Sequence, residues 1–438
     1  MPEIVVIGGG LAGSEAAWKA SKMGVKVTLY EMKPKKFSPA HKSGGLAELV
    51  CSNSLRSESE ENASGLLKKE MTILDSIIIS AAEKTRVPAG SALAVDRQRF
   101  SEYITDKLKS EPNIEIVTEE VGKLEFDVPT VVATGPLTTE GLTEEIMGLT
   151  GSDKLFFYDA ISPIIFTESI NMNAAFRGSR YGKGGDDYIN LPMSEEEYYG
   201  LVREIKKADE VTPHSFEDKK IFEGCLPIEV MVRRGDNTLA FGPMKPVGLE
   251  DPKTGERPFA VVQLRQENKE GTLYNIVGFQ TRLKQGEQDR VFRMIPGLEN
   301  AQFARYGSVH RNTFISSPRL LFPTLELKRR PGLFISGQLV GVEGYVESAA
   351  MGILSGINAA LLALNEGLMI PPRDTALGSL VSYITDKRNR DFQPMNINFG
   401  LFPSPPAGVR KKDRKRYMVK RALKEMGLWE EKISRLTA

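Results

Sequence analysis

The first thirty residues carry an ordered pattern of apolar and polar positions. A short apolar run, Ile4–Ile7, is rich in β-branched residues and too short for a helix, so it predicts a strand. Helical spacing follows over Ser14–Met23, and apolar and polar residues then alternate over Val25–Tyr30, which predicts a second strand ending at Glu31. The chain is therefore expected to open with a strand-turn-helix-strand unit.

Three glycines lie in the first turn with the spacing G-x-G-x-x-G, at Gly8, Gly10 and Gly13. In the dinucleotide fingerprint the first glycine makes a tight turn, the second lets the backbone approach a pyrophosphate, and the third lets the helix pack on the strand. The helix N-terminus offers N–H groups to the phosphates. Glu31 lies 18 residues after Gly13, near the spacing of about 20 for a ribose-binding carboxylate. The pattern predicts a dinucleotide site, and the alternative is a glycine-rich βαβ turn without a ligand.

A long polar stretch over residues 32–65 separates this unit from the next predicted elements. Loops of this length inside a domain are usually functional, and this one contains Cys51. Further on, Pro129–Gly135 is an apolar strand that ends in Ala-Thr-Gly, a feature typical of flavoproteins that open with the same unit. The other elements expected before residue 165 are helices over Leu66–Glu83 and Gln98–Leu108 and a strand over Ile114–Val117.

The pattern changes between residues 166 and 305. Short alternating runs are separated by turn sequences rich in Gly, Asp, Asn and Pro, and a helix is expected over Ser194–Lys207. This region predicts an inserted α+β unit with a mostly antiparallel sheet. Its expected strands are Asp187–Leu191, Thr238–Phe241, Ala260–Leu264 and Leu273–Phe279.

The opening fold resumes after the insertion, with a strand over Gly332–Ile335 and a small-residue helix over Glu347–Leu364. The small residues suit tight packing alone or a helix whose N-terminus faces a flavin ring, and we favour the second. The fold class predicted is α/β: a Rossmann-like, glutathione-reductase-type FAD-binding domain with an inserted α+β domain. The expected division is 1–165 and 306–370 for the FAD-binding domain, 166–305 for the insertion and 371–438 for a C-terminal segment with a basic helix.

Charge is distributed unevenly although the net charge is only +1. Residues 410–424 hold nine Lys or Arg and one Asp, which is +8, so the remainder has 49 basic and 56 acidic residues, which is −7. A basic block on an otherwise acidic protein suits an anionic partner such as nucleic acid. The alternative is a solvated amphipathic helix.

The chain shows no basic leader and no apolar stretch near the roughly 18 residues of a membrane span, so a cytoplasmic protein is expected. Its two cysteines, Cys51 and Cys225, form no CxxC pair. Cys51 has polar neighbours and Cys225 apolar ones; either can be a buried apolar residue, or both can converge on a flavin as nucleophiles. Three histidines far apart in the chain make a structural zinc site unexpected, and no metal is predicted.

Several blocks of this sequence closely resemble one family over nearly the whole chain. They include VIGGGLAGSEAAW, CSNSLRSE, RVPAGSALAVDR, FGPMKPVGL, HRNTF, GVEGYVESAAMG and FQPMNINFG. The chain resembles the folate- and FAD-dependent tRNA uracil-5 methyltransferases (TrmFO). The resemblance implies C5 methylation of the T-loop uridine of tRNA, with methylenetetrahydrofolate as one-carbon donor and NAD(P)H as reductant through FAD. Neither a membrane nor an obligate protein partner is expected.

The resemblance places the catalytic cysteines at Cys51 and Cys225. Uracil C5 becomes nucleophilic once a thiolate adds at C6, and a second group must later remove the C5 proton. We assign Cys225 as the nucleophile and Cys51 as the base or the keeper of the one-carbon unit, although the sequence also permits the reverse.

The resemblance also implies three sets of binding residues. His310 is expected to stack on the folate. The tRNA-binding residues are expected to be Arg410, Lys411, Lys412, Arg414, Lys415 and Arg416. The FAD-binding residues are expected to be Gly8, Gly9, Gly10, Leu11, Ala12, Gly13, Glu31, Thr134, Gly135, Gly341, Val342, Gly344 and Tyr345.

Three alternatives remain at this stage. The related flavoproteins that modify the tRNA wobble uridine share the fold but are much longer. A plain flavin oxidoreductase would favour a CxxC pair and would not need the basic block. A non-catalytic flavin-bound RNA-binding protein would tolerate loss of both cysteines.

Overall fold

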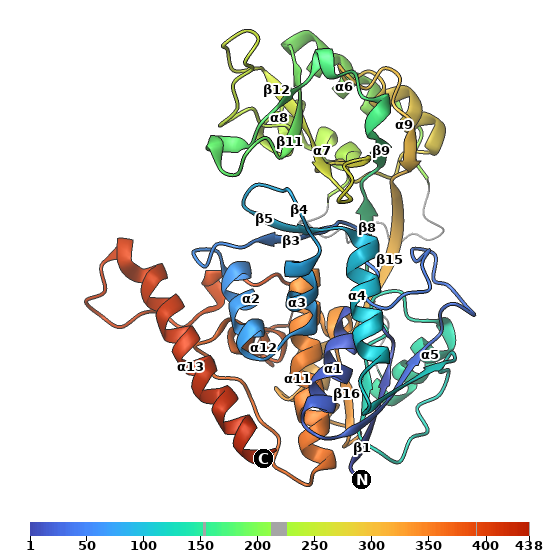
Figure 1. The fold of residues 1–438 in the computed structure, drawn as a ribbon, viewed down its shortest axis with the longest axis vertical. Coiled ribbons are helices and arrows are strands. Elements are labelled where there is room, and N and C mark those ends of the chain that lie inside the picture. The colour runs from blue at the N-terminus through green and yellow to red at the C-terminus, as the bar shows by residue number, and fades with distance from the viewer. Residues whose placement is uncertain (152–154, 212–225, 391, 438) are drawn as a thin grey trace.

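The computed structural model describes residues 1–151, 155–211, 226–390 and 392–437. The opening pattern forms a five-stranded parallel sheet in the order β16-β7-β1-β2-β6, in the lower half of Figure 1. β1 is central, and its apolar residues are buried on both faces, as parallel strands require. The Rossmann-like α/β prediction is confirmed. The strands are β1 (Glu3–Ile7), β2 (Lys26–Glu31), β6 (Ile114–Thr118), β7 (Thr130–Val132) and β16 (Leu333–Ile335).

Two helices pack against each other beside this sheet, α1 (Leu11–Lys22) and α11 (Tyr345–Ala363). A Cβ added at Gly352 would lie 2.2 Å from the carbonyl oxygen of Ala12, so the small residues of α11 permit close helix–helix contact. By length and composition α11 could cross a membrane, so the expectation of no such stretch is wrong; 83% of its apolar window is nevertheless buried within the protein.

Helices α2 and α3 replace the single helix expected over Leu66–Glu83. The chain turns at Asp75, which has a left-handed φ of 61°, and Ser76 caps the second helix by accepting from the Ile79 N–H. The carboxyl of Glu15 accepts from the N–H groups of Ile77 and Ile78 and stabilises this new helix start. The surrounding helices are α2 (Ala63–Ile73), α3 (Ile77–Lys84), α4 (Arg97–Lys109), α5 (Glu140–Thr150), α10 (Ser317–Leu320) and α12 (Ala376–Ile384).

A second, antiparallel sheet of six strands lies above the first in Figure 1, in the order β10-β11-β12-β13-β9-β14. It has its own apolar cluster, which includes Tyr198, Tyr274 and Phe292. The mostly antiparallel sheet expected here is confirmed. The strands are β9 (Ile164–Phe166), β10 (Phe176–Arg177), β11 (Tyr188–Met193), β12 (Ala260–Gln266), β13 (Leu273–Ile276) and β14 (Phe303–Arg305).

One expected strand of this region is wrong: Thr238–Phe241 is the short helix α8. Four residues are too few for their periodicity to separate a strand from a helix. Leu239 is buried and Phe241 is exposed, which suits one helical turn on the apolar cluster. The other helices of this half are α6 (Glu195–Lys207), α7 (Ile228–Arg234) and α9 (Gln285–Phe292).

Two smaller sheets join the halves. An antiparallel pair runs between them, and a three-stranded sheet lies beneath the upper half (Figure 1). The polar stretch expected to be a loop therefore contains a strand. The pair is β8 (Leu155–Ile161) and β15 (Ser308–Phe314), and the small sheet is β3 (Ser54–Ser57), β4 (Arg86–Val87) and β5 (Ala92–Val95).

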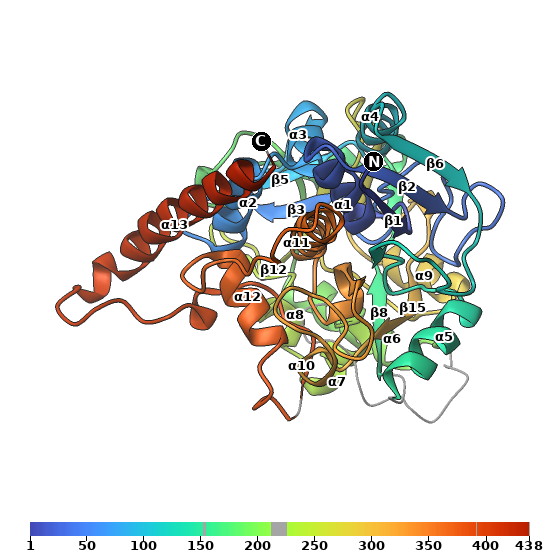
Figure 2. The same ribbon diagram turned by 90° about the horizontal axis from the view of Figure 1, so that it is seen from below.

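The C-terminal helix α13 (Arg414–Leu436) is amphipathic. Met418, Ala422, Met426, Trp429 and Ile433 form its buried stripe, which packs on the lower core. Figure 2 shows that the first turns of α13 project away from the body of the molecule. The basic residues of the helix start are therefore exposed.

Candidate active site

The glycine turn forms a cradle between β1 and α1. Gly8 has a φ of +100°, and a Cβ there would lie 2.8 Å from the Ala133 carbonyl oxygen; a Cβ at Gly13 would lie 1.7 Å from that of Gly8. A Cβ at Gly10 would meet no atom of the described residues within 4 Å. The first and third glycines are therefore required by the fold, whereas the second faces open space, as a pyrophosphate site requires.

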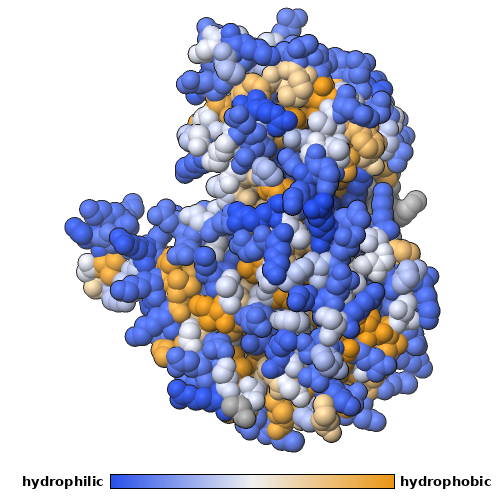
Figure 3. Space-filling model, in the orientation of Figure 1, coloured by the Kyte–Doolittle hydropathy of each residue, from blue (hydrophilic) through white to orange (hydrophobic). Residues whose placement is uncertain are grey.

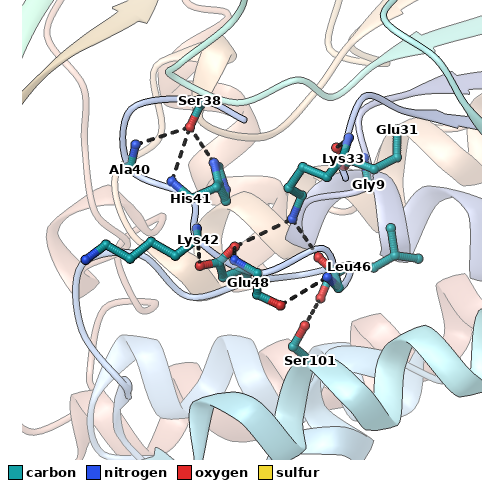
Figure 4. A network of polar contacts seen from close by, with 12 residues as sticks. Gly9, Glu31, Lys33, Ser38, Ala40, His41, Lys42, Leu46, Glu48 and Ser101 are labelled. Carbon is teal, nitrogen blue, oxygen red and sulfur yellow. Dashed lines mark hydrogen bonds and ion pairs between the residues drawn. The ribbon is translucent and has the colours of Figure 1, made fainter. Parts of the chain in front are cut away.

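Glu31 closes the cradle at the end of β2. Its carboxylate accepts hydrogen bonds from the backbone N–H groups of Gly9 and Lys33, both at 2.9 Å, and the residue is only 7% exposed. Figure 4 shows Glu31 and Gly9 facing each other beside the following loop. The acid identified from spacing alone therefore lies directly on the glycine turn.

The loop after β2 is held by buried polar contacts, drawn in Figure 4. Lys33 donates to the Gly45 carbonyl at 2.6 Å and pairs with Glu48 at 3.7 Å. The Nδ1 atom of His41 lies 2.6 Å from the Ser38 hydroxyl. Burial, and next the charge of Lys33, lower the pKa of His41, so its ring is neutral near pH 7.

These residues line a cavity that extends to the start of α11. Of the residues expected to hold FAD, Gly13 lies beneath the turn, Gly344 lines a neighbouring cavity, and Gly341 and Val342 are buried. The others line this cavity: Gly8, Gly9, Gly10, Leu11, Ala12, Glu31, Thr134, Gly135 and Tyr345.

Cys51 lines a second cavity. Tyr345, Gln338 and Val50 line both cavities, so the two spaces share a wall. The Tyr345 hydroxyl accepts from the backbone N–H groups of Cys51, at 2.6 Å, and Ser52, at 3.1 Å. Burial, followed by the nearby Cys51, raises the pKa of Tyr345, so the phenol stays neutral. A half-buried thiol is thus placed beside the cradle.

Two polar side chains that line the second cavity have atoms without a partner in the part of the chain that the structure describes. Asn312 is 4% exposed, and its side-chain amide makes no hydrogen bond within the described part of the chain. Glu347 pairs with Arg56 at 3.4 Å through one oxygen, while its other oxygen is buried with no hydrogen-bond partner among the described residues. Burial raises the pKa of Glu347. An amide and a carboxyl suit a heterocycle with a hydrogen-bonding edge.

The remaining predicted residues lie elsewhere or outside the described residues. Cys225 lies outside them. His310 belongs to β15, where its backbone pairs with Asp159, and its side chain is not among the described features. The predicted tRNA-binding residues are exposed around the start of α13, which is mostly hydrophilic in Figure 3. Of these, Arg410 pairs with Asp413 at 3.0 Å.

Four residues near Cys51 were not singled out from the sequence. The guanidinium of Arg97 donates to the Leu49 and Cys51 carbonyls and pairs with Glu267. Arg265 donates to the side chain of Asn53, which is fully buried. The sequence did contain one signal for this group. Arg265 interrupts the mostly apolar run of β12, and a charged residue inside such a strand usually needs a polar partner.

The parallel sheet, glycine turn and Glu31 define a dinucleotide-binding α/β protein with a cysteine-containing cavity beside the dinucleotide site. The family model described as "Glucose inhibited division protein A" (GIDA) matches residues 3–367. A relative in Citrifermentans bemidjiense, named "Methylenetetrahydrofolate--tRNA-(uracil-5-)-methyltransferase TrmFO", is 58% identical over 433 residues, covering 99% of both chains. A relative of the same name in Natranaerobius thermophilus is 57% identical over 432 residues, again covering 99% of both.

The fold is also that of a solved structure, Aquifex aeolicus GidA in its form II crystal. The TM-score is 0.70 at 20% identity, covering 99% of this chain and 75% of that one. The chain belongs to the GIDA family and, within it, to the TrmFO group. The resemblance identified from the sequence blocks is confirmed.

Proposed function

We propose that this protein methylates C5 of a uracil in tRNA, with methylenetetrahydrofolate as the one-carbon donor and FAD bound in the cradle. The observation that supports this proposal is the wall shared by the two cavities: one contains the glycine turn and Glu31, and the other contains Cys51. The names of the full-length relatives support the reaction and the folate. We further propose that the target is the T-loop uridine and that NAD(P)H is the reductant.

The residues present fit FAD. Gly10 offers open space for the pyrophosphate at the start of α1, and Glu31 can accept from a ribose hydroxyl. Thr134 and Gly135 at the end of β7, with Tyr345 at the start of α11, extend the site toward the second cavity. When bound, the reduced flavin supplies the two electrons that bring the one-carbon unit to the methyl level. We propose residues 1–165 and 306–370 as the FAD-binding domain, with 166–305 inserted and 371–438 as the C-terminal segment.

The cysteines supply the covalent chemistry on the pyrimidine. A Cys225 thiolate adds to C6, which forms an S–C6 bond and moves an electron pair to C5. C5 then forms a bond to the one-carbon unit, and Cys51, as a thiolate, accepts the proton of C5. The bond between the transferred carbon and its carrier nitrogen breaks with its electron pair going to that nitrogen, which takes up a proton, and a methylene group double-bonded to C5 is left. Two electrons and a proton reduce this methylene to methyl, and the S–C6 bond breaks with its pair returning to sulfur, which restores the C5–C6 double bond. The opposite assignment of the two thiols satisfies the same balance, and single-cysteine variants separate the two.

The second cavity is proposed to hold the reacting heterocycles. The amide of Asn312 can pair with a donor–acceptor edge, and the Arg56–Glu347 pair offers a guanidinium and a carboxyl, whose pKa burial raises, beside it. His310, two residues before Asn312 on β15, is proposed to stack on the folate.

The start of α13 is proposed to bind the tRNA backbone. Its exposed Arg and Lys side chains can neutralise phosphates, which supplies affinity without reading sequence. A tRNA substrate also implies a cytoplasmic protein.

A tritium-release assay tests the proposed reaction. Holoenzyme, NADPH and methylenetetrahydrofolate are incubated with tRNA that carries tritium at uracil C5. We expect release that depends on folate and is lost in Cys225→Ala, which should keep its yellow colour. Full activity of Cys225→Ala would refute the nucleophile assignment; no release from a protein with reducible FAD would indicate an oxidoreductase or a binding protein.

A further inference from the structure

The loop Leu49–Asn53, which we name the Cys51 loop, lies between the two halves of the molecule. On one side is α4 of the lower half, which begins with Arg97. On the other side is the end of β12 in the upper half, followed by Glu267. The position of the thiol therefore depends on side chains from both halves.

The side chain of Arg97, on α4 of the lower half, binds both the Cys51 loop and Glu267 of the upper half. Its Nη1 donates to the Leu49 carbonyl at 2.9 Å, and its Nη2 lies 3.4 Å from the Cys51 carbonyl. Its Nε and Nη2 donate to the two Glu267 oxygens at 2.7 Å and 3.2 Å, a bidentate pair. The side chains of this pair are only 17% and 3% exposed. Because one planar guanidinium binds two carbonyls of the Cys51 loop and the Glu267 carboxylate, it restricts the conformations that the loop can adopt.

Docking of the two halves does not require Arg97, because other contacts provide it. The Asn53 amide donates to the carbonyls of Val95 and Gln266, and Asp96 accepts from the Lys269 N–H. Arg99, two residues after Arg97 on α4, pairs with Glu270 between the same two halves, and among the described residues its ion pairs go to Asp96 and Glu270 rather than to the Cys51 loop. Arg99 is thus a matched control for Arg97.

The charged and titratable groups that face Cys51 come from several elements. Arg97 on α4, Arg305 on β14 and Tyr345 on α11 each interact electrostatically with the thiol. Behind them, Glu267 pairs with Arg97, and Glu48 interacts with Arg305. Cations near a thiol stabilise its anion.

We propose that Arg97, oriented by Glu267, is the positioning residue of Cys51: it fixes the loop through the Leu49 and Cys51 carbonyls and keeps a positive charge beside the thiol. The proposal rests on the proposed function only in taking Cys51 as a catalytic cysteine. The reactivity of its thiol can be measured without tRNA or folate.

The chain has two cysteines, so Cys225→Ala leaves Cys51 as the one thiol to be alkylated. The alkylation rate of this holoenzyme by iodoacetamide is measured from pH 5 to 10, and then again with Arg97→Gln, Arg97→Lys or Arg99→Gln added. We expect Arg97→Gln to shift the pH midpoint upward by about one unit, which slows the reaction at pH 7 about tenfold. Arg99→Gln should leave the profile unchanged.

Arg97→Lys separates charge from geometry. Lysine keeps the charge but cannot reproduce the fork. We expect a midpoint near that of the parent, and, in the protein with both cysteines, a methylation kcat about tenfold lower with an unchanged KM for tRNA. This variant also keeps the test open if Arg97→Gln fails to retain FAD.

Two results would overturn the role of Arg97: an unchanged pH profile in FAD-retaining Arg97→Gln, or full activity of Arg97→Lys. Failure of the proposed function is distinguishable. A shifted alkylation profile in a protein that never releases tritium would keep Arg97 as the positioning residue and refute the methyltransferase.

Discussion

The dinucleotide cradle and the Cys51 loop adjoin one cavity wall but are built in opposite ways. The cradle is made by one continuous stretch, in which Glu31 contacts Gly9 only 22 residues away. The Cys51 loop is held by Tyr345, 294 residues away, and by β12, more than 200 residues away. The cradle depends on close contacts between backbone atoms, so we expect substitutions that enlarge its glycines to disrupt it. The Cys51 loop depends on side chains that are distant in sequence, so we expect substitutions that truncate those side chains to disrupt it.

Gly13→Ala should have the largest effect, because its Cβ would lie 1.7 Å from the Gly8 carbonyl oxygen, which is backbone. We expect loss of folded holoenzyme, or destabilisation above about 4 kcal/mol, measured by urea unfolding and by the FAD content of purified protein. Gly10→Ala is the matched control, since its Cβ meets open space. It should keep the fold while FAD affinity falls at least tenfold; normal FAD affinity would contradict the pyrophosphate site.

Glu15 on α1 should give the cradle an unusual pH dependence. Burial raises the pKa of Glu15 to about 8. Because the unfolded carboxyl ionises near 4.5, its stabilisation is fully present below that pH and is lost as pH rises through about 8. Relative to Glu15→Gln, the parent should lose of the order of 3 to 5 kcal/mol between pH 4.5 and 8, seen in denaturant unfolding at several pH values. Parallel stability curves for the two proteins would disprove this.

Asn53→Ala should break the joint at the Cys51 loop. It leaves the Arg265 Nε and two backbone carbonyls of buried strands without their partner. We expect a loss of about 2 to 4 kcal/mol of stability with FAD still bound, together with slower Cys51 alkylation. Thermal unfolding measures the loss of stability, and the FAD absorbance of the purified variant shows whether the cradle still binds its cofactor. Loss of FAD with unchanged reactivity of the Cys51 thiol would contradict the account, because it would show that Asn53 supports the cradle and not the Cys51 loop.

The smallest effect on stability is expected at the start of α13, a helix whose buried stripe packs on the lower core and on α2. Neutralising Lys411, Lys412, Arg414 and Lys415 should leave FAD content and unfolding unchanged, because these residues are exposed. Binding of tRNA should weaken about 10- to 100-fold, and its log–log salt slope should flatten by up to about 3. Unchanged binding and slope would exclude this surface from tRNA recognition.

The parts that sequence predicted well are those with local causes. The β-branched run at Ile4–Ile7, the glycine spacing and the alternation before Glu31 each act within a few residues, and the sheet follows from them. The break at Asp75 was invisible because the Glu15 carboxyl that caps α3 lies about 60 residues away in sequence. Arg97 was invisible for the same reason, since its contacts to Leu49 and Glu267 exist only after folding.

The type of the shortest elements was predicted wrongly for a different reason. Thr238–Phe241 has four residues, too few to show a period, and its single helical turn is set by burial of Leu239. The roles of Cys225 and His310 remain predictions from the resemblance. The placement of Cys51 beside the cradle required the structure, because Tyr345, which holds its backbone, comes from α11, 294 residues further along the chain.

The most direct test of the account follows the transferred carbon. Holoenzyme, NADPH and unmodified tRNA are incubated with methylenetetrahydrofolate labelled with carbon-13 in its methylene group, and the tRNA is digested to fragments and nucleosides for mass spectrometry. The account predicts labelled 5-methyluridine in the T-loop fragment, at one methyl per tRNA. Label in another nucleoside or fragment, or unlabelled tRNA from a protein whose FAD is reduced by NADPH, would contradict it.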